Sequence, residues 1–108
     1  MAAKELAAYV HDQLAGLPGV RSIPMMGGYI FYYQERIFGG IYGPGMMIKD
    51  TPAARAAMPG SEPLPPCSGA KGMLPCSVLD DREAFQSMVR AMLDELPSPK
   101  SRKRKEKP

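Results

Sequence analysis

Apolar side chains recur at helical spacing near the N-terminus of the chain. The recurring positions are Leu6, Val10, Leu14 and Leu17. Residues three and four apart lie on one side of a helix, so these side chains form a single apolar stripe. The pattern predicts a helix over residues 3–17, and Pro18-Gly19 ends it because proline cannot continue a helix.

A second helical pattern, the clearest in the chain, lies near the C-terminus. Asp80 stands where an N-cap is expected and Glu83 follows three residues later, which is the arrangement of a capping box. A continuous apolar face comes next. Its residues are Phe85, Met88, Val89, Met92, Leu93 and Leu96. The pattern predicts a helix that begins after Asp80 and is ended by Pro97.

Between Val20 and Lys49 the pattern changes to short β-favouring runs that are separated by turn residues. The turns are Gly27-Gly28, Gln34-Glu35-Arg36 and Gly43-Pro44-Gly45. They divide the segment into four predicted strands, over residues 20–26, 29–33, 37–42 and 46–49. Connections this short join antiparallel strands. Gly39-Gly40, inside the third strand, indicates a bulge or a close backbone contact.

A short helix and a loop are expected after these strands. Asp50 or Thr51 caps the helix, which continues over residues 53–58 with Pro52 in its first turn, where a missing N–H costs nothing. Residues 61–72 are rich in Pro, Ser and Gly. Their composition predicts a loop that is long enough to be functional.

Proline also indicates how the strands are ordered. Pro24 lies in the first strand, and Pro75 lies in a fifth strand predicted over residues 73–79. Because proline gives no ladder hydrogen bond, both strands are expected at edges of the sheet. The elements together define an α+β fold. We expect a two-layer sandwich, with the N- and C-terminal helices packed on one face of an antiparallel sheet of about five strands.

The net charge of +3 divides unequally along the chain. Residues 98–108 hold six cations against one glutamate, whereas the other 97 residues hold eight cations against ten carboxylates. The six cations of this basic tail are Lys100, Arg102, Lys103, Arg104, Lys105 and Lys107. A segment without apolar side chains other than proline is expected to be disordered. Residues 1–97 are then the folded domain, and the tail either binds nucleic acid in a salt-sensitive way or serves only as a solubilising extension.

The segment Met25-Met26-Gly27-Gly28-Tyr29 resembles the Met-Phe-Gly-Gly-Tyr segment that opens the sheet in TfoX N-terminal domains. The resemblance continues in Ile37-Phe38-Gly39-Gly40-Ile41-Tyr42, in Met47-Ile48-Lys49-Asp50 and in the acidic-capped last helix, and it covers residues 3–96. Position 26 is methionine where that family usually has phenylalanine. The chain also has a basic tail where the competence regulators of this type carry a helical second domain. The resemblance implies a non-enzymatic regulatory or interaction module, linked to transcriptional or competence regulation.

Residues that could carry catalysis are few. Acid–base or nucleophilic chemistry needs a nucleophile, a base and an orienting group in one place. His11 lies beside the apolar stripe of the first helix, Cys67 in the predicted loop and Cys76 in the predicted fifth strand. The two cysteines do not have the spacing of a zinc knuckle, and helix capping explains Asp80-Asp81. We therefore expect no catalytic, metal or cofactor site, and the alternative is a pocket beneath residues 61–72 lined by either cysteine.

The aromatic residues of the second strand are the candidate interface. Tyr29, Phe31 and Tyr33 share one face of that strand, while Ile30 and Tyr32 lie on the other. One face has to contact the helices, and an apolar second face favours self-association or a protein partner. A base-stacking platform is less favoured because such platforms come with several cations.

No apolar run is long enough to cross a membrane and no secretory signal is present, so we expect a cytoplasmic protein without membrane contact. Three functions remain open. The sequence favours a regulatory module that binds a protein partner or a second copy of itself. The alternatives are a nucleic-acid-associated protein that acts through its basic tail, and a small-molecule binder or enzyme that uses residues 61–72.

Overall fold

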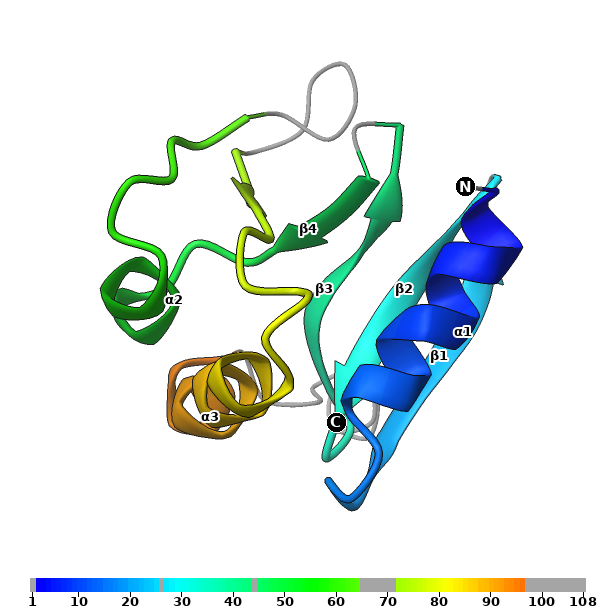
Figure 1. The fold of residues 1–108 in the computed structure, drawn as a ribbon, viewed down its shortest axis with the longest axis horizontal. Coiled ribbons are helices and arrows are strands. Elements are labelled where there is room, and N and C mark those ends of the chain that lie inside the picture. Colours follow the sequence, from blue (N-terminus) through cyan, green and yellow to red (C-terminus); the bar gives the residue numbers. More distant parts are fainter. Residues whose placement is uncertain (1, 26, 44, 65–71, 97–108) are drawn as a thin grey trace, which may run out of the picture.

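The computed structural model describes residues 2–25, 27–43, 45–64 and 72–96 (Figure 1). Its elements follow the predicted order. They are α1 (Ala3–Gln13), β1 (Val20–Met25), β2 (Gly28–Tyr33), β3 (Arg36–Tyr42), β4 (Gly45–Ile48), α2 (Pro52–Ala57), β5 (Leu74–Pro75), α3 (Arg82–Met92) and a terminal 3₁₀ turn, η1 (Leu93–Glu95). Residues 65–71 and the basic tail lie outside the described residues, so the loop and tail predictions stay predictions.

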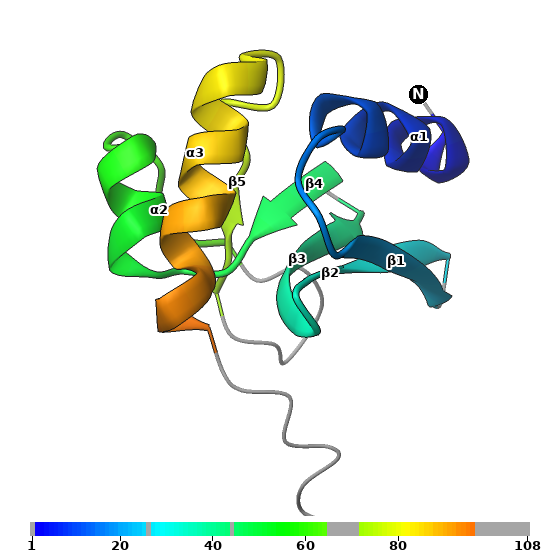
Figure 2. The ribbon, with the colours of Figure 1, turned by 90° about the horizontal axis from the view of Figure 1, so that it is seen from below.

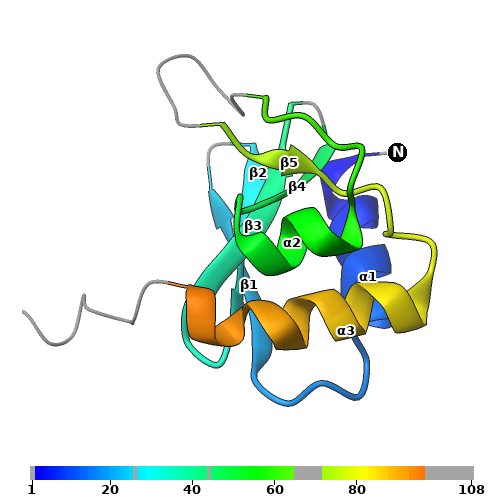
Figure 3. The same cartoon turned by 90° about the vertical axis from the view of Figure 1, so that its left-hand side faces the viewer.

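The two-layer α+β architecture is confirmed. The five strands form one antiparallel sheet in the order β1-β2-β3-β4-β5, so each strand pairs with its neighbour in the chain. The helices α1, α2 and α3 lie on one side of this sheet, with α1 over the β1–β2 end (Figure 2). Figure 3 shows α2 and α3 side by side, where they form the rest of the helix layer. As Pro24 and Pro75 predict, β1 and β5 are the edge strands.

The first helix is shorter than the expected residues 3–17. It ends at Gln13, and the chain then turns, with Gly16 at a φ of +105° that favours glycine. Leu14 and Leu17 are nevertheless buried, because the turn carries them into the core beside the helix stripe. A repeat of apolar residues therefore continued past the end of the helix that it predicted.

The fifth strand is also shorter than the expected residues 73–79. Only Leu74 and Pro75 pair with β4, and Cys76 donates a last backbone hydrogen bond to the Met46 carbonyl. Val78 and Leu79 leave the sheet in a turn and pack against the core instead. Their burial explains why the sequence around them is apolar without being a strand.

At each of the two later helices, one of two adjacent candidate residues forms the N-cap and the other makes a different contact. The Asp81 side chain accepts a hydrogen bond from the Ala84 N–H and caps α3, so the expectation that Asp80 does so is wrong. Asp80 instead accepts a hydrogen bond from the Tyr9 hydroxyl at 2.6 Å. At α2 the Thr51 hydroxyl is the cap, while Asp50 forms an ion pair with Arg55.

Gly39-Gly40 marks both of the features predicted for it. The register between β2 and β3 shifts next to these residues, and Phe38 becomes the extra residue of a bulge. Phe38 is fully buried, with its ring 6.1 Å from the ring of Phe31. A Cβ atom on Gly40 would lie 2.5 Å from the Tyr29 carbonyl oxygen, so only glycine fits there.

Candidate functional site

The sequence-derived interface residues lie mostly inside the molecule. Phe31 is fully buried and Tyr33 is 6% exposed, and both belong to the core beneath the helices. Tyr29, on the same face, keeps part of its surface exposed near the start of α1. Strand alternation shows that these residues share a face, but it does not say which face the helices cover. Phe31 and Tyr33 are thus packing residues, and only Tyr29 is available to a partner.

The opposite face of β1, β2 and β3 is apolar and is not covered by any described helix (Figure 2). Residues paired across an antiparallel sheet point to the same side, so the register defines the members of this surface. We call it the open face. It includes Arg21, Ile23, Met25, Ile30, Tyr32, Ile37 and Tyr42. Ile23 and Met25 are 38% and 51% exposed, and the other apolar members are partly exposed.

One end of the open face carries an ion pair. The Arg21 guanidinium lies 4.1 Å from the centre of the Tyr32 ring and donates a hydrogen bond of 3.1 Å to the Glu35 carboxylate. Both side chains are about half exposed. Arg21 is the one cation among the named residues of the open face. Since Glu35 neutralises it, the open face has little to attract a polyanion.

A strained turn holds Glu35 in this position. Gln34 and Glu35 form the two-residue turn between β2 and β3, and both have positive φ values, 52° and 69°. Hairpin turns of this kind usually contain Asn and Gly. The Gln34 side chain donates a hydrogen bond of 2.7 Å to the Pro18 carbonyl, and its backbone N–H bonds to the Gly19 carbonyl. These bonds anchor the turn to the segment before β1, and the Glu35 carboxylate lies beside Arg21 at this end of the sheet.

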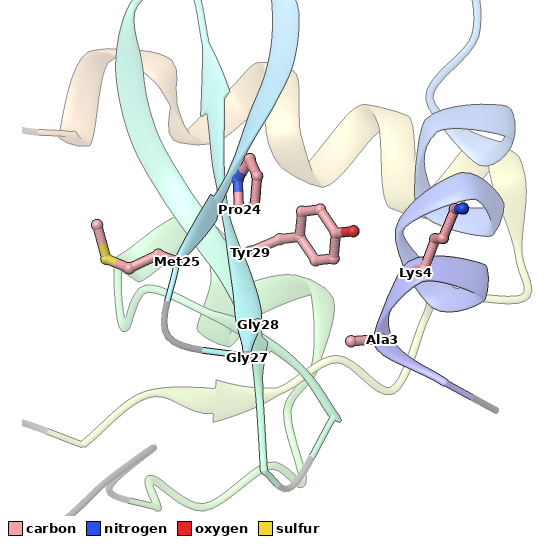
Figure 4. Close-up of a pocket in the computed structure, with 7 residues that line it drawn as sticks. All are labelled: Ala3, Lys4, Pro24, Met25, Gly27, Gly28 and Tyr29. Carbon is pink, nitrogen blue, oxygen red and sulfur yellow. The ribbon is translucent and has the colours of Figure 1, made fainter.

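An open hollow of about 410 Å³ lies beside the open face, where the β1–β2 hairpin approaches the start of α1 (Figure 4). Its described lining consists of Ala3, Lys4, Pro24, Met25, Gly27, Gly28 and Tyr29. The Tyr29 ring projects from β2 towards the helix, as Figure 4 shows. The lining offers one ammonium and one phenol, and it contains no carboxylate, thiol or imidazole that could share a proton with a substrate near neutral pH.

His11 and Ser22 form the one described pair that resembles a base and a nucleophile. The His11 Nε2 atom and the Ser22 Oγ atom are 2.8 Å apart, and the imidazole packs against Phe31 at 5.0 Å between ring centres. Ser22 lies within a regular strand and does not line the hollow. The pair joins α1 to β1, and the geometry describes a structural contact rather than a catalytic one.

Cys76 has the properties of an unreactive thiol. It packs against the core, and burial raises the pKa of Cys76 to about 12. The nearby Asp80 carboxylate raises it further, while a hydrogen bond from the Val78 backbone to the sulfur opposes both effects. A cysteine nucleophile needs a lowered pKa, so this environment argues against one. Cys67, the other predicted candidate, lies outside the described residues, as does most of the loop that was expected to cover a pocket.

No group of three or more His, Cys, Asp or Glu side chains that could hold a metal ion occurs among the described residues. In the same part of the chain, no helix has the length and apolarity needed to cross a membrane. The hydrogen bond to Asp80 raises the pKa of Tyr9, and the hydrogen bonds from Arg55 lower the pKa of Asp50. Both shifts come from surface contacts that fasten helices rather than from a substrate site.

Sequence reasoning anticipated an apolar second face but placed the candidate interface on the wrong side of the second strand, although the sequence contains a signal for the correct one. The first strand alternates as Arg21, Ile23, Met25 on one side, and the second strand is apolar on both sides. Ile23 of the first strand and Ile30 of the second are directly opposite each other in the sheet. The missing information was which of the two alternating groups of side chains the helices cover, because the other group is then the exposed one.

Fold and site together define a small two-layer α+β domain that presents an apolar sheet face beside a shallow hollow. The chain is 33% identical to the uncharacterized 12.7 kDa protein encoded in the trpE 5′ region of Spirochaeta aurantia, over 102 residues that span 94% of this chain and 89% of that protein. It therefore belongs to the same family as this spirochaete protein. No family model and no solved structure matches the chain.

Proposed function

We propose that the protein is a non-enzymatic regulatory module that acts by binding another protein chain through its open face. The observation that carries the proposal is the exposure of Ile23 and Met25 on a sheet face that no described helix covers. Contiguous apolar surface of this kind usually marks an interaction site. The resemblance to TfoX N-terminal domains supports the same class of function and suggests a role in transcriptional or competence regulation.

The contrast with the rest of the molecule supports this proposal. Three helices cover the other sheet face, and their exposed sides carry charged residues such as Arg82, Glu83 and Arg90. The hollow and the His11–Ser22 pair lack the combination of groups that acid–base catalysis requires. The open face is thus the described surface with the composition of an interface core, which is depleted in charge and rich in large apolar side chains.

A charge placed on the open face tests the proposal. Ile23→Lys changes an exposed residue of an edge strand, and we expect it to keep the fold while abolishing partner binding. Ala91→Lys, on the exposed side of α3, is the matched control. Proteins cross-linked to tagged versions of the chain in its host cell are compared by mass spectrometry. Partners kept by Ala91→Lys and lost from Ile23→Lys support the proposal, whereas the same partners on both variants contradict it.

The basic tail supports a second candidate function, the anchoring of the domain on nucleic acid. Six cations in residues 98–108 would release counterions from a polyanion, with a slope of up to about −5 for the logarithm of affinity against the logarithm of salt concentration. We expect exchange of all six for glutamine in the full chain to remove DNA and RNA binding in a salt titration. Undiminished binding by the exchanged chain would show that the tail is not the anchor.

A further inference from the structure

Proline removes a backbone donor from each outward edge of the sheet. In β1, the Gln34 N–H bonds to the Gly19 carbonyl, which sets the alternation of the ladder and turns the backbone of Pro24 away from β2. In β5, the bond from Cys76 to Met46 sets the alternation in the same way and turns Pro75 away from β4. Each outward edge therefore lacks a donor at its proline, and beside β5 the backbone of Met73 is already paired with that of Leu64.

Association through the open face is then favoured over the addition of a strand at either edge. The face is apolar except for Arg21, and Glu35 stands at the same end of the sheet. One cation and one anion beside an otherwise uncharged surface make that surface electrostatically complementary to itself. A partner of different composition would need to supply both charges in the matching places, whereas a second copy supplies them automatically.

We propose that the partner is a second copy of this chain, packed face to face through Arg21, Ile23, Ile30, Tyr32 and Ile37. The inference rests on the proposed function and names its partner. Two sheets pack with their strands nearly aligned. A two-fold axis between the sheets and along β2 lays β1 of one copy over β3 of the other and keeps the same ends together. Arg21 of each copy then lies next to Glu35 of the other, and the ion pairs within the chains are exchanged for pairs between them.

The dimensions of the face indicate a weak dimer. Three strands of six to seven residues cover about 20 Å by 15 Å, from the strand rise and spacing. A surface of this size falls in the class of transient interfaces, which bury less than about 1,200 Å² in total. We therefore expect reversible dimerisation that depends on concentration, with the charge of Glu35 at the end of the interface.

The test uses two charge-reversal variants, measured separately and then mixed. Arg21→Glu gives a chain with two anions at this end of the face, and Glu35→Arg gives a chain with two cations. Sedimentation equilibrium of the full chain at up to about 500 μM is expected to show a dimer for the unaltered protein and about tenfold weaker association for each variant alone. An equal mixture of the two variants is expected to recover the dimer, because every anion in the mixed dimer faces a cation of the other chain.

Charge changes off the face provide the control. Arg90→Glu and Asp94→Arg alter an exposed pair of opposite charge near the end of α3, and neither is expected to change the association of the chain. A monomeric unaltered protein, or a mixture of Arg21→Glu and Glu35→Arg that associates no better than its components, overturns the inference. If the protein stays monomeric while Ile23→Lys still loses a different cross-linked protein, the proposed function stands and only the identity of the partner is wrong.

Discussion

The surroundings of a single side chain decide its chemistry in this protein, and Cys76 is the clearest case. Sequence alone leaves it as a candidate nucleophile. In the structure it packs against the core, and burial raises the pKa of its thiol to about 12. The ordinary pKa of a cysteine is about 8.5, so the folded chain holds far less thiolate at neutral pH than an unfolded chain does.

We expect Cys76 to be protected from thiol reagents in the folded chain. The measurement uses a Cys67→Ser variant, so that Cys76 is the one thiol present, and follows its reaction with a disulfide reagent at pH 8. The folded chain should react at least about a hundredfold more slowly than the same chain in denaturant, because both access and ionisation are reduced. Reaction at the rate of an unfolded thiol would show that Cys76 is exposed and ionised.

The same shift affects stability at alkaline pH. The pKa of the thiol is higher in the folded chain than in the unfolded chain, so unfolding releases a proton between about pH 8.5 and pH 12. The contribution of the group is fully present below that window and is lost as the pH rises through it. The Cys67→Ser variant should therefore lose stability with rising pH more steeply than a chain that also carries Cys76→Ala.

At the scale of elements, a few backbone contacts set the shape of the sheet. The bulge at Phe38 directs this ring into the core beside Phe31. Two residues further on, a Cβ atom at Gly40 would meet the Tyr29 carbonyl oxygen and the Tyr42 ring. The pairing of β2 with β3, on which the open face depends, thus requires a residue without a side chain at this position.

We expect Gly40→Ala to destabilise the protein by about 2 kcal/mol, since its Cβ atom would overlap the backbone of the neighbouring strand. Gly43→Ala is the matched control, because nothing lies within 4 Å of the place where its Cβ atom would stand. That change should stay within about 0.5 kcal/mol. Urea denaturation measures both, and equal midpoints for the two variants would contradict this account of the β2–β3 contact.

At the scale of the whole molecule, side chains of α3 hold the end of α1. The carbonyl groups in the last turn of a helix lack partners within it. The Gln86 amide donates hydrogen bonds of 2.8 Å and 3.0 Å to the carbonyls of Gln13 and Ala15, and Arg82 donates one to the Asp12 carbonyl. Helices from opposite ends of the chain are thereby joined into one layer over the sheet.

Removal of this connection tests its importance. Gln86→Ala should lower the free energy of unfolding by about 1 kcal/mol, because the carbonyls of Gln13 and Ala15, at and just after the end of α1, lose the donor that Gln86 provides. Ser87→Ala, at the exposed neighbouring position of α3, should change it by less than about 0.5 kcal/mol. Thermal and urea unfolding of both variants measure the difference. No loss of stability in Gln86→Ala would mean that water replaces the amide without cost.

Local patterns in the sequence determined the elements and much of their order. Helical periodicity predicted both terminal helices, the β-favouring runs predicted four strands, and Pro24 and Pro75 predicted the two edges. These features depend on neighbouring residues and on backbone hydrogen bonds that proline cannot make, so sequence alone carries them. The ends of α1 and β5 were predicted too far along, because core packing selects apolar residues beyond an element as well as within it.

Only the tertiary structure decided what each element does. Alternation along β2 defines two apolar faces equally well, and the arrangement of three helices buries Phe31 and Tyr33 while leaving Ile23 exposed. The choice between Asp80 and Asp81 as a cap depends on Tyr9, which is 71 residues away from Asp80 in the chain. Such outcomes arise from contacts between distant segments, and no local pattern contains the information that selects them.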